Sequence, residues 1–189
     1  MRRAVIACDD GVVRKLSGGL TLVACVLWSL GEGPLLVGHL PVHVDGLDAT
    51  SQITFLIKTL MSRATIVDAV LLDALTIAGF NVVSPASVYE KTGIPVIILY
   101  KRRPRWGRIY SALRSHFEDY DLRLRVVGLL RDVITVRTSR GLLYAVLWGI
   151  SVRDAARIIE SYQLYARIPE PLRMAHLYAS ALSRVLIQE

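Results

Sequence analysis

Residues 5–11, VIACDDG, place four apolar residues directly before two acids. A continuous apolar run is typical of a strand that is covered on both faces. A carboxylate at the end of such a strand is costly in a low-dielectric interior unless a turn or a cation compensates its charge. The stretch therefore predicts a buried strand over Ala4–Cys8, followed either by a turn at Gly11 or by a site that uses one of the acids.

The composition favours an α/β protein inside a cell. The chain has 189 residues, 53% of them hydrophobic, and a formal net charge of +7. Its longest uncharged stretch, Leu16–Gly31, has 16 residues, whereas a spanning helix needs roughly 20. The N-terminus reaches acids too early for a secretory signal, so we expect a cytoplasmic protein with no membrane partner. Reduced thiols are expected there, although Cys8 and Cys25 could also pair across a hairpin.

Apolar runs, turn residues and helical periodicity predict one domain over residues 1–189. The predicted strands are Ala4–Cys8, Leu20–Leu30, Leu35–Val44, Val67–Leu72, Ile94–Tyr100, Arg123–Leu129 and Leu142–Leu147. The predicted helices run from Asp48 or Thr50 to Arg63, over Pro85–Lys91, Arg108–Phe117 and Val152–Leu164, and from Pro171 to Leu186. This order predicts a three-layer fold with a mixed sheet, three antiparallel strands first and parallel strands later, and helices on both faces.

Asp73 ends the predicted strand Val67–Leu72, as Asp9 ends the first strand. If these strands are parallel neighbours, the two carboxylates lie close enough to share a hard cation such as Mg²⁺ or Mn²⁺. Because side chains alternate along a strand, Asp9 and Asp10 point to opposite faces, and Asp10 is expected to bond the turn at Gly11. The plain alternative is that Asp9 and Asp73 only stabilise turns.

The segment from Lys101 to Tyr110, KRRPRWGRIY, is strongly basic. Its cations can neutralise phosphates, and Trp106 can stack on exposed bases. We therefore predict a nucleic-acid contact, to DNA or RNA, that consists of Lys101, Arg102, Arg103, Arg105, Trp106 and Arg108. The plain alternative is a solvated loop. The histidines, His176 among them, show no metal-ligand spacing.

Several stretches resemble an archaeal family of uncharacterised proteins, the domain of unknown function 99. They are CDDG, VDGLDAT, LLDALTIAGFNVV, TGIPVIILYK and GISVRDAARIIESYQLYARIPEPLR. That family in turn resembles endonuclease V, which has a ribonuclease-H-like fold. The resemblance covers most of the chain, from about Val5 to Leu182, and implies that the strands ending in Asp9 and Asp73 are neighbours.

The resemblance also implies roles for single residues. Asp9 and Asp73 match the family's metal-binding aspartates, and Lys101 matches its catalytic lysine. Gln52 stands where the family has a metal-binding glutamate, so Asp48, with Asp45 as the alternative, is the nearest acid for a third ligand. The family's histidine falls on Trp148 or Gly149.

These observations lead to three hypotheses. The first is a Mg²⁺- or Mn²⁺-dependent endonuclease that cuts near a deaminated base, inosine or deoxyuridine, as in DNA repair. In it Asp9, Asp73 and Lys101 are the catalytic residues. The second is a nucleic-acid-binding protein on the same scaffold that has lost catalysis. The third is an enzyme that acts on a small phosphorylated substrate.

Overall fold

The protein is described by a computed structural model over residues 3–13, 19–62, 66–128 and 132–187. Its strands are β1 (Arg3–Asp10), β2 (Leu20–Ser29), β3 (Gly33–His43), β4 (Ile66–Leu72), β5 (Thr76–Ile77), β6 (Asn81–Val82), β7 (Val96–Tyr100), β8 (Ile134–Thr138) and β9 (Gly141–Trp148). Its helices are α1 (Ala49–Met61), α2 (Pro85–Thr92), α3 (Trp106–His116), α4 (Tyr120–Gly128), α5 (Val152–Ser161) and α6 (Glu170–Leu186). Within these ranges, no helix is long and apolar enough to cross a membrane.

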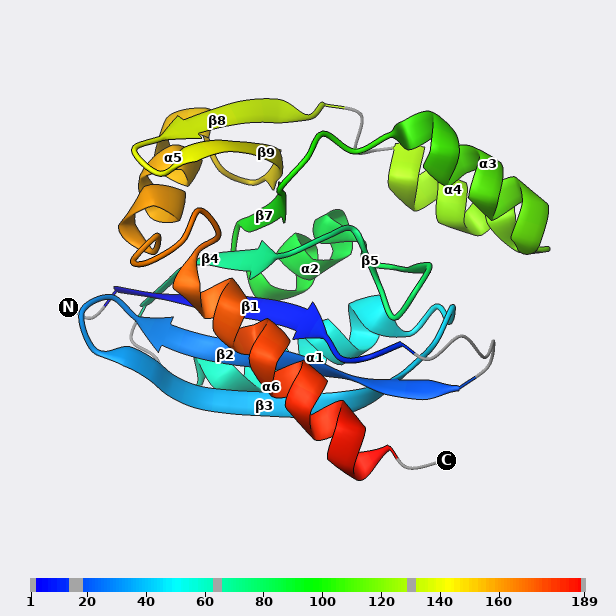
Figure 1. The fold of residues 1–189 in the computed structure, drawn as a ribbon, viewed down its shortest axis with the longest axis horizontal. Coiled ribbons are helices and arrows are strands. Elements are labelled where there is room, and N and C mark those ends of the chain that lie inside the picture. Colours follow the sequence, from blue (N-terminus) through cyan, green and yellow to red (C-terminus); the bar gives the residue numbers. More distant parts are fainter. Residues whose placement is uncertain (1–2, 14–18, 63–65, 129–131, 188–189) are drawn as a thin grey trace.

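One seven-stranded sheet, in the order β3-β2-β1-β4-β7-β9-β8, forms the middle of the molecule (Figure 1). The first three strands form the predicted antiparallel meander, β4 pairs in parallel with β1, and β7 pairs in parallel with β4. The expectation of a parallel strand over 142–147 is wrong. A tight hairpin after β8, a strand that the sequence analysis did not predict, reverses the chain, so β9 runs antiparallel to both β8 and β7.

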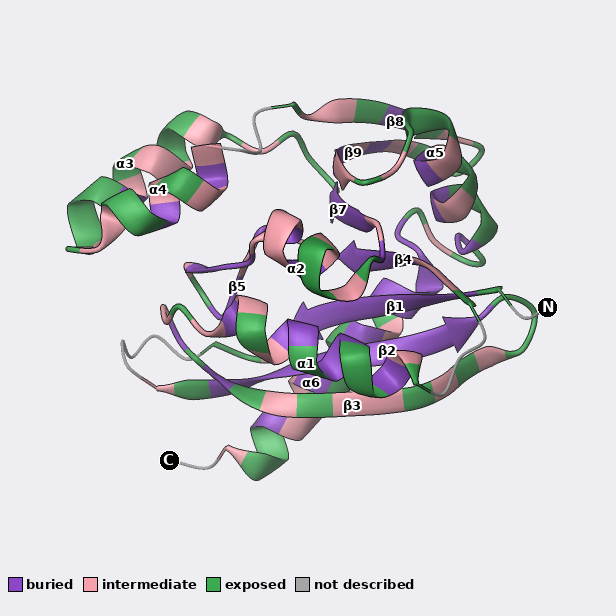
Figure 2. Cartoon of the chain, turned by 180° about the vertical axis from the view of Figure 1, so that it is seen from behind, coloured by how far each residue is buried: buried purple, intermediate pink, exposed green. Residues whose placement is uncertain are grey.

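Two hydrophobic cores cover the two faces of the sheet. Because side chains alternate, Ile6 and Cys8 of β1 face α1 and α2, whereas Val5 and Ala7 face α5 and α6. Strands β1 and β2 are buried almost throughout, whereas β3 alternates between exposed and half-buried residues, as expected for an edge strand (Figure 2). The three-layer architecture with helices on both faces is confirmed.

The predicted strand over Arg123–Leu129 is wrong, because residues 123–128 belong to α4. The buried residues of this helix are Arg123 and Val127, which are four positions apart and lie on one helical face. The Arg123 guanidinium donates to the Asp119 carboxylate and to the backbone carbonyls of Asp45, Gly46 and Phe80. These bonds compensate the burial of the cation and fix α4 to the body of the protein.

The end of β1 is not a turn. The Gly11 N–H donates to the Leu22 carbonyl at 2.8 Å and continues the pairing with β2. One residue before the two acids, Cys8 lies opposite Cys25 and is joined to it by a disulfide. The expectation of reduced thiols is therefore wrong for this pair, because the β1–β2 register places the two side chains face to face.

Candidate active site

Asp9 and Asp73 lie side by side at the carboxyl ends of neighbouring parallel strands. The register pairs Cys8 of β1 with Leu72 of β4, so each aspartate is the next residue on its strand. Adjacent strands are about 4.8 Å apart, and both aspartates follow the alternation that points toward α6. The strand neighbours that the resemblance implied are therefore present in the fold.

Asp9 is a buried acid whose carboxylate contacts one solvent-exposed histidine. Only 6% of the residue is exposed. Its Oδ1 accepts the Asp10 N–H at 2.9 Å, and its Oδ2 lies 2.9 Å from Nδ1 of His176. His176 belongs to α6, which crosses β1 and β2 in Figure 1, and its side chain is 61% exposed. The histidine therefore links the buried carboxylate to solvent.

Asp9, Asp10 and Asp73 act on one another electrostatically at the carboxyl ends of β1 and β4. Burial, followed by the charges of Asp10 and Asp73, raises the pKa of Asp9 to about 8. Burial also raises the pKa of Asp73, against the opposing effect of Lys101 and His176. Negative charge is thus disfavoured at both carboxyls, and a cation placed between them would relieve that penalty.

Asp10 has a structural partner on the opposite face, as the alternation along β1 predicts. Its Oδ2 accepts the backbone N–H of Ala78 at 2.5 Å, and burial raises its pKa. The expected bond to a turn at Gly11 is therefore replaced by a bond to Ala78. Ala78 has a positive φ of 47°, and Asp10 thereby ties the segment after β4 to the end of β1.

Lys101 follows β7 directly and acts on Asp73 from the next strand along the sheet. It also lines a pocket of about 240 Å³ together with Arg167 and Arg173. The cationic side chains Lys101, Arg102, Arg103, Arg105 and Arg108 are all exposed. The basic segment predicted from the sequence is thus accessible and begins beside Asp73.

Trp106 does not extend from this basic segment as a free stacking surface. It is half-buried, packs against the core of the α1 side, and meets Tyr100 edge-on with ring centroids 6.3 Å apart. The structure therefore gives Trp106 a role in anchoring the start of α3, and stacking of this half-buried ring on a base stays a prediction.

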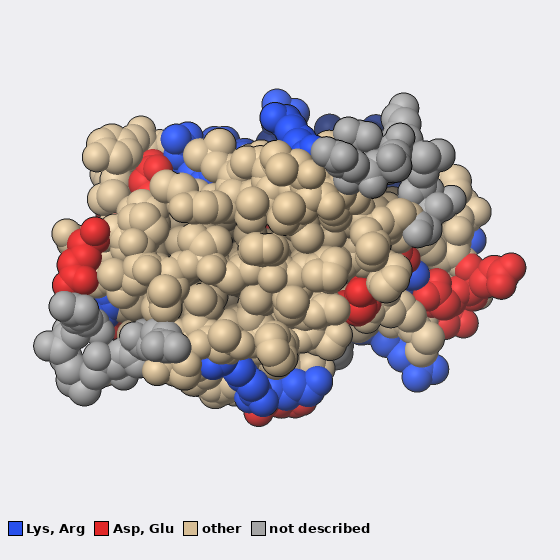
Figure 3. Space-filling view, turned by 90° about the horizontal axis from the view of Figure 1, so that it is seen from below, with Lys and Arg blue, Asp and Glu red and all other residues tan. Residues whose placement is uncertain are grey.

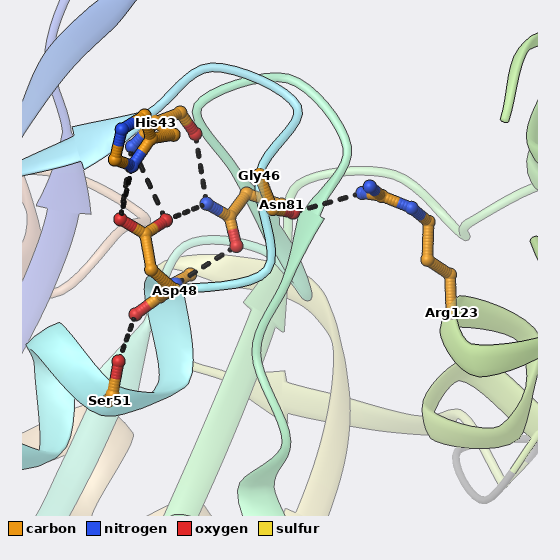
Figure 4. A network of polar contacts seen from close by, with 7 residues as sticks. His43, Gly46, Asp48, Ser51, Asn81 and Arg123 are labelled. Atoms are coloured by element: carbon orange, nitrogen blue, oxygen red, sulfur yellow. Dashed lines mark hydrogen bonds and ion pairs between the residues drawn. The ribbon is translucent and has the colours of Figure 1, made fainter. Parts of the chain in front are cut away.

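Asp48 belongs to a separate polar network around the start of α1 (Figure 4), and Asp45 makes its own contact on the preceding loop. The Asp48 carboxylate accepts from the backbone N–H of His43 and from the Asn81 amide, and lies 2.8 Å from Nδ1 of His43. Asp45 accepts the Phe80 N–H at 2.8 Å. The prediction of a third ligand from either residue conflicts with these contacts, because their oxygens already hold the loops together.

Comparison with known proteins assigns the chain to a family. The family model described as Endonuclease dU matches residues 2–183. The chain belongs to the Endonuclease dU family. A relative of this family member, the UPF0215 protein of Aeropyrum pernix, is 42% identical over 185 residues, which are 96% of this chain and 98% of that protein.

Two solved structures share the fold of this Endonuclease dU family member. A protein of unknown function from Archaeoglobus fulgidus has a TM-score of 0.81 at 25% identity, covering 95% of this chain and 97% of the other. Endonuclease V of Ciona intestinalis, in complex with a 24mer DNA containing an inosine followed by a ribo-adenosine, has a TM-score of 0.59 at 15% identity. The match covers 94% of this chain and 84% of the Ciona intestinalis chain. The expected endonuclease V architecture, a ribonuclease-H-like fold, is confirmed.

His176 is the site residue that sequence reasoning missed in this Endonuclease dU chain. The resemblance directed attention to Trp148 and Gly149, but Trp148 packs against the core, and a Cβ at Gly149 would lie 2.5 Å from the Tyr89 ring. The available signal was the position of His176 within IPEPLRMAHL, four residues after Leu172 and three before Ala179 on the buried face of α6.

The donor set at Asp9 and Asp73 is compatible with a hard divalent cation. Within the ranges that the structure describes, no group of three or more His, Cys, Asp or Glu side chains is arranged to hold a metal ion. Mg²⁺, however, is commonly held by one or two carboxylates and completes its shell with water and substrate phosphates. Two adjacent oxygen donors whose pKa values are raised meet that requirement.

Proposed function

We propose that this protein is a metal-dependent endonuclease that hydrolyses a phosphodiester bond near a deaminated base, as in DNA repair. The observation that carries the proposal is the adjacency of Asp9 and Asp73 at the ends of β1 and β4. Membership of the Endonuclease dU family and the endonuclease V fold support it. Inosine and deoxyuridine are the candidate bases, and DNA or RNA is the candidate substrate.

In this proposal Asp9 and Asp73 hold Mg²⁺ or Mn²⁺. The ion would polarise a phosphoryl oxygen and lower the pKa of a bound water. His176 holds the carboxylate of Asp9 in place through its Nδ1. Lys101, beside Asp73, stabilises negative charge on the phosphate, and the exposed arginines that follow it contact the nucleic-acid backbone.

A specific observation favours a second candidate, a nucleic-acid-binding protein without catalysis. Gln52 on α1 is neutral, and both Asp45 and Asp48 are held by other partners. A centre with only two carboxylates binds a cation less tightly than one with three. The fold and the basic segment support nucleic-acid binding in either case.

The test is cleavage of oligonucleotides that contain inosine or deoxyuridine, in Mg²⁺ and in Mn²⁺. We expect nicking by the wild-type protein and its loss in Asp73→Asn and Asp9→Asn. Glu118→Gln, which removes an exposed acid on the α3–α4 turn, is the matched control and should cut normally. Intact substrate together with salt-sensitive binding would support the second candidate.

A readout that is independent of cleavage tests the metal itself. Mg²⁺ should raise the melting temperature of the wild-type protein, because an ion that binds only the folded state stabilises it. The same addition should have much less effect on Asp73→Asn. An equal shift in wild type, Asp73→Asn and Glu118→Gln would show that Mg²⁺ acts elsewhere.

A further inference from the structure

All the charged side chains that line the pocket beside Lys101 are cations that donate hydrogen bonds. It has a volume of about 240 Å³ and is lined by Lys101, Ala166, Arg167, Ile168 and Arg173. No carboxylate is part of this lining. Lysine and arginine cannot accept hydrogen bonds, so the pocket suits an anion that presents several acceptor oxygens.

The cations of this pocket differ in how far they are already neutralised. Arg173 donates through Nε to Oε2 of Glu170 at 3.0 Å. Arg167 has no acidic partner among the described residues, and its aliphatic stem lies against Gly141, whose added Cβ would be 3.3 Å from the Arg167 Cδ. The exposed guanidinium of Arg167 is therefore supported by packing and free to bind a ligand.

Two residues of the pocket connect it to the Asp9–Asp73 pair. Lys101 lines the pocket and also acts electrostatically on Asp73. Arg173 and His176 are three residues apart on α6, and residues at that spacing are neighbours on a helix surface. Since His176 contacts Asp9, α6 carries one residue of the pocket and one partner of the buried aspartate on adjacent turns.

We propose that Arg167 and Arg173, beside Lys101, form a binding site for the phosphate group of the nucleic-acid strand next to the phosphate that is cut. This inference rests on the proposed function and extends it to residues outside the basic segment 101–108. The pocket shares Lys101 with the surroundings of Asp73, and Arg173 lies on the same helix as His176, so a strand bound at the aspartates would have its next phosphate on this side. Guanidinium groups bind phosphate with two parallel hydrogen bonds, which fixes the register of the strand.

Binding measured without cleavage tests this site. A fluorescein-labelled oligonucleotide with one deoxyuridine is titrated in EDTA at salt concentrations between about 50 and 200 mM. Arg167→Gln should weaken binding about three- to tenfold and lower the slope of log Kd against log salt by about one. Arg167→Lys, which keeps the charge, should retain the slope.

Arg184→Gln is the matched control, because this exposed arginine lies on the same helix, 11 residues beyond Arg173. It should leave both affinity and slope unchanged. An unchanged slope in Arg167→Gln, or equal losses in Arg167→Gln and Arg184→Gln, would overturn the site.

The outcomes also separate this inference from the nuclease proposal. Normal cleavage with a wild-type salt slope in Arg167→Gln would overturn the phosphate site and leave the nuclease standing. A slope that depends on Arg167 in a protein that never cuts would support the site and overturn the nuclease. Failure of the wild-type protein to bind any oligonucleotide at low salt would overturn both.

Discussion

Asp9 is the residue at which burial and charge conflict most directly. It is almost fully buried, lies within the electrostatic reach of two further aspartates, and has a single histidine partner. A residue chosen for stability alone would be apolar at this position, like Cys8 before it. The conflict is resolved if a cation binds, which is the physical reason to look for function here.

The raised pKa of Asp9 predicts how the metal-free protein responds to pH. An unfolded aspartate loses its proton near pH 4 and the folded one near pH 8. Between these values the folded state holds the additional proton, so stability falls as pH rises toward 8. Asp9→Asn removes this contribution and should stabilise the protein at pH 8, which raises the melting temperature by several degrees.

The measurement is thermal unfolding in EDTA from pH 4 to pH 9. The stabilisation by Asp9→Asn should shrink toward pH 4, where the carboxyl is protonated in the folded state and about half protonated in the unfolded state. Glu118→Gln serves again as the control. Parallel pH profiles for wild type and Asp9→Asn would contradict the assignment.

His176 offers a second prediction at the scale of a residue. Removing a group that orients a metal ligand typically lowers metal affinity or activity about 10- to 100-fold, and we expect this of His176→Ala. His176→Asn can place an amide nitrogen near the position of Nδ1 and should recover part of the loss. His39→Ala, an exposed histidine of the edge strand β3, is the control.

The discriminating measurement is the Mg²⁺ concentration that gives half-maximal cleavage. A positioning role predicts that this concentration rises in His176→Ala and recovers in His176→Asn. A lower melting temperature with an unchanged Mg²⁺ requirement would instead show that His176 only stabilises the fold.

At the scale of elements, the packing of α6 on β1 depends on the absence of a side chain at Gly11. A Cβ at this position would lie 2.5 Å from the Ser183 Oγ and 2.6 Å from the Ala179 carbonyl oxygen. The same Ser183 Oγ accepts the Val12 N–H at 2.9 Å. The close approach holds the helix that carries His176 against the strand that carries Asp9.

Gly11→Ala should therefore destabilise the protein by roughly 1–3 kcal/mol, because neither backbone can retreat without repacking the core. Gly107→Ala is the matched control. Gly107 lies in α3 with no atom near an added Cβ, and alanine there should raise stability by about 0.5–1 kcal/mol. Denaturant unfolding measures both, and equal effects of the two substitutions would contradict the close packing of α6.

Over the whole molecule, the net charge of +7 is unevenly placed. Figure 3 shows the view from below the sheet, where charged side chains lie around the margin and the described middle is uncharged. Strand β3, on the lower side of the molecule in Figure 1, contains no Lys, Arg, Asp or Glu. The predicted nucleic-acid contact lies instead beyond the end of β7, where the basic segment begins.

Replacement of Arg102, Arg103 and Arg105 together by glutamine should lower the salt dependence of oligonucleotide binding, with a loss of about three units of slope. Melting temperature should be unchanged because all three side chains are exposed. A triple replacement of Arg137, Arg140 and Arg153, exposed residues of the β8–β9 hairpin and α5, is the control. Equal losses in the two triple variants would indicate a general charge effect and no localised contact.

The sequence by itself determined the fold class, most element positions and the two strand-end aspartates. Each of these depends on short-range patterns, namely apolar runs for buried strands, helical spacing for α1 and α6, and acids that directly follow a buried strand. The pattern failed at 123–128, where the helix buries a charged residue, Arg123, and so lacks the usual apolar face. It also failed at 142–147, because the direction of that strand depends on a hairpin.

Only the tertiary structure decided which side chains meet. His176 reaches Asp9 from 167 residues away because α6 crosses the sheet. Asp45 and Asp48 make structural contacts to the β5–β6 segment, and the backbone carbonyl of Asp45 accepts from Arg123 of α4. Arg167 lies beside Lys101 because the segment between α5 and α6 packs against the end of β7. Local sequence patterns determine which residues are buried and whether a segment is a helix or a strand. The contacts between the site residues depend instead on how elements distant in the sequence pack together.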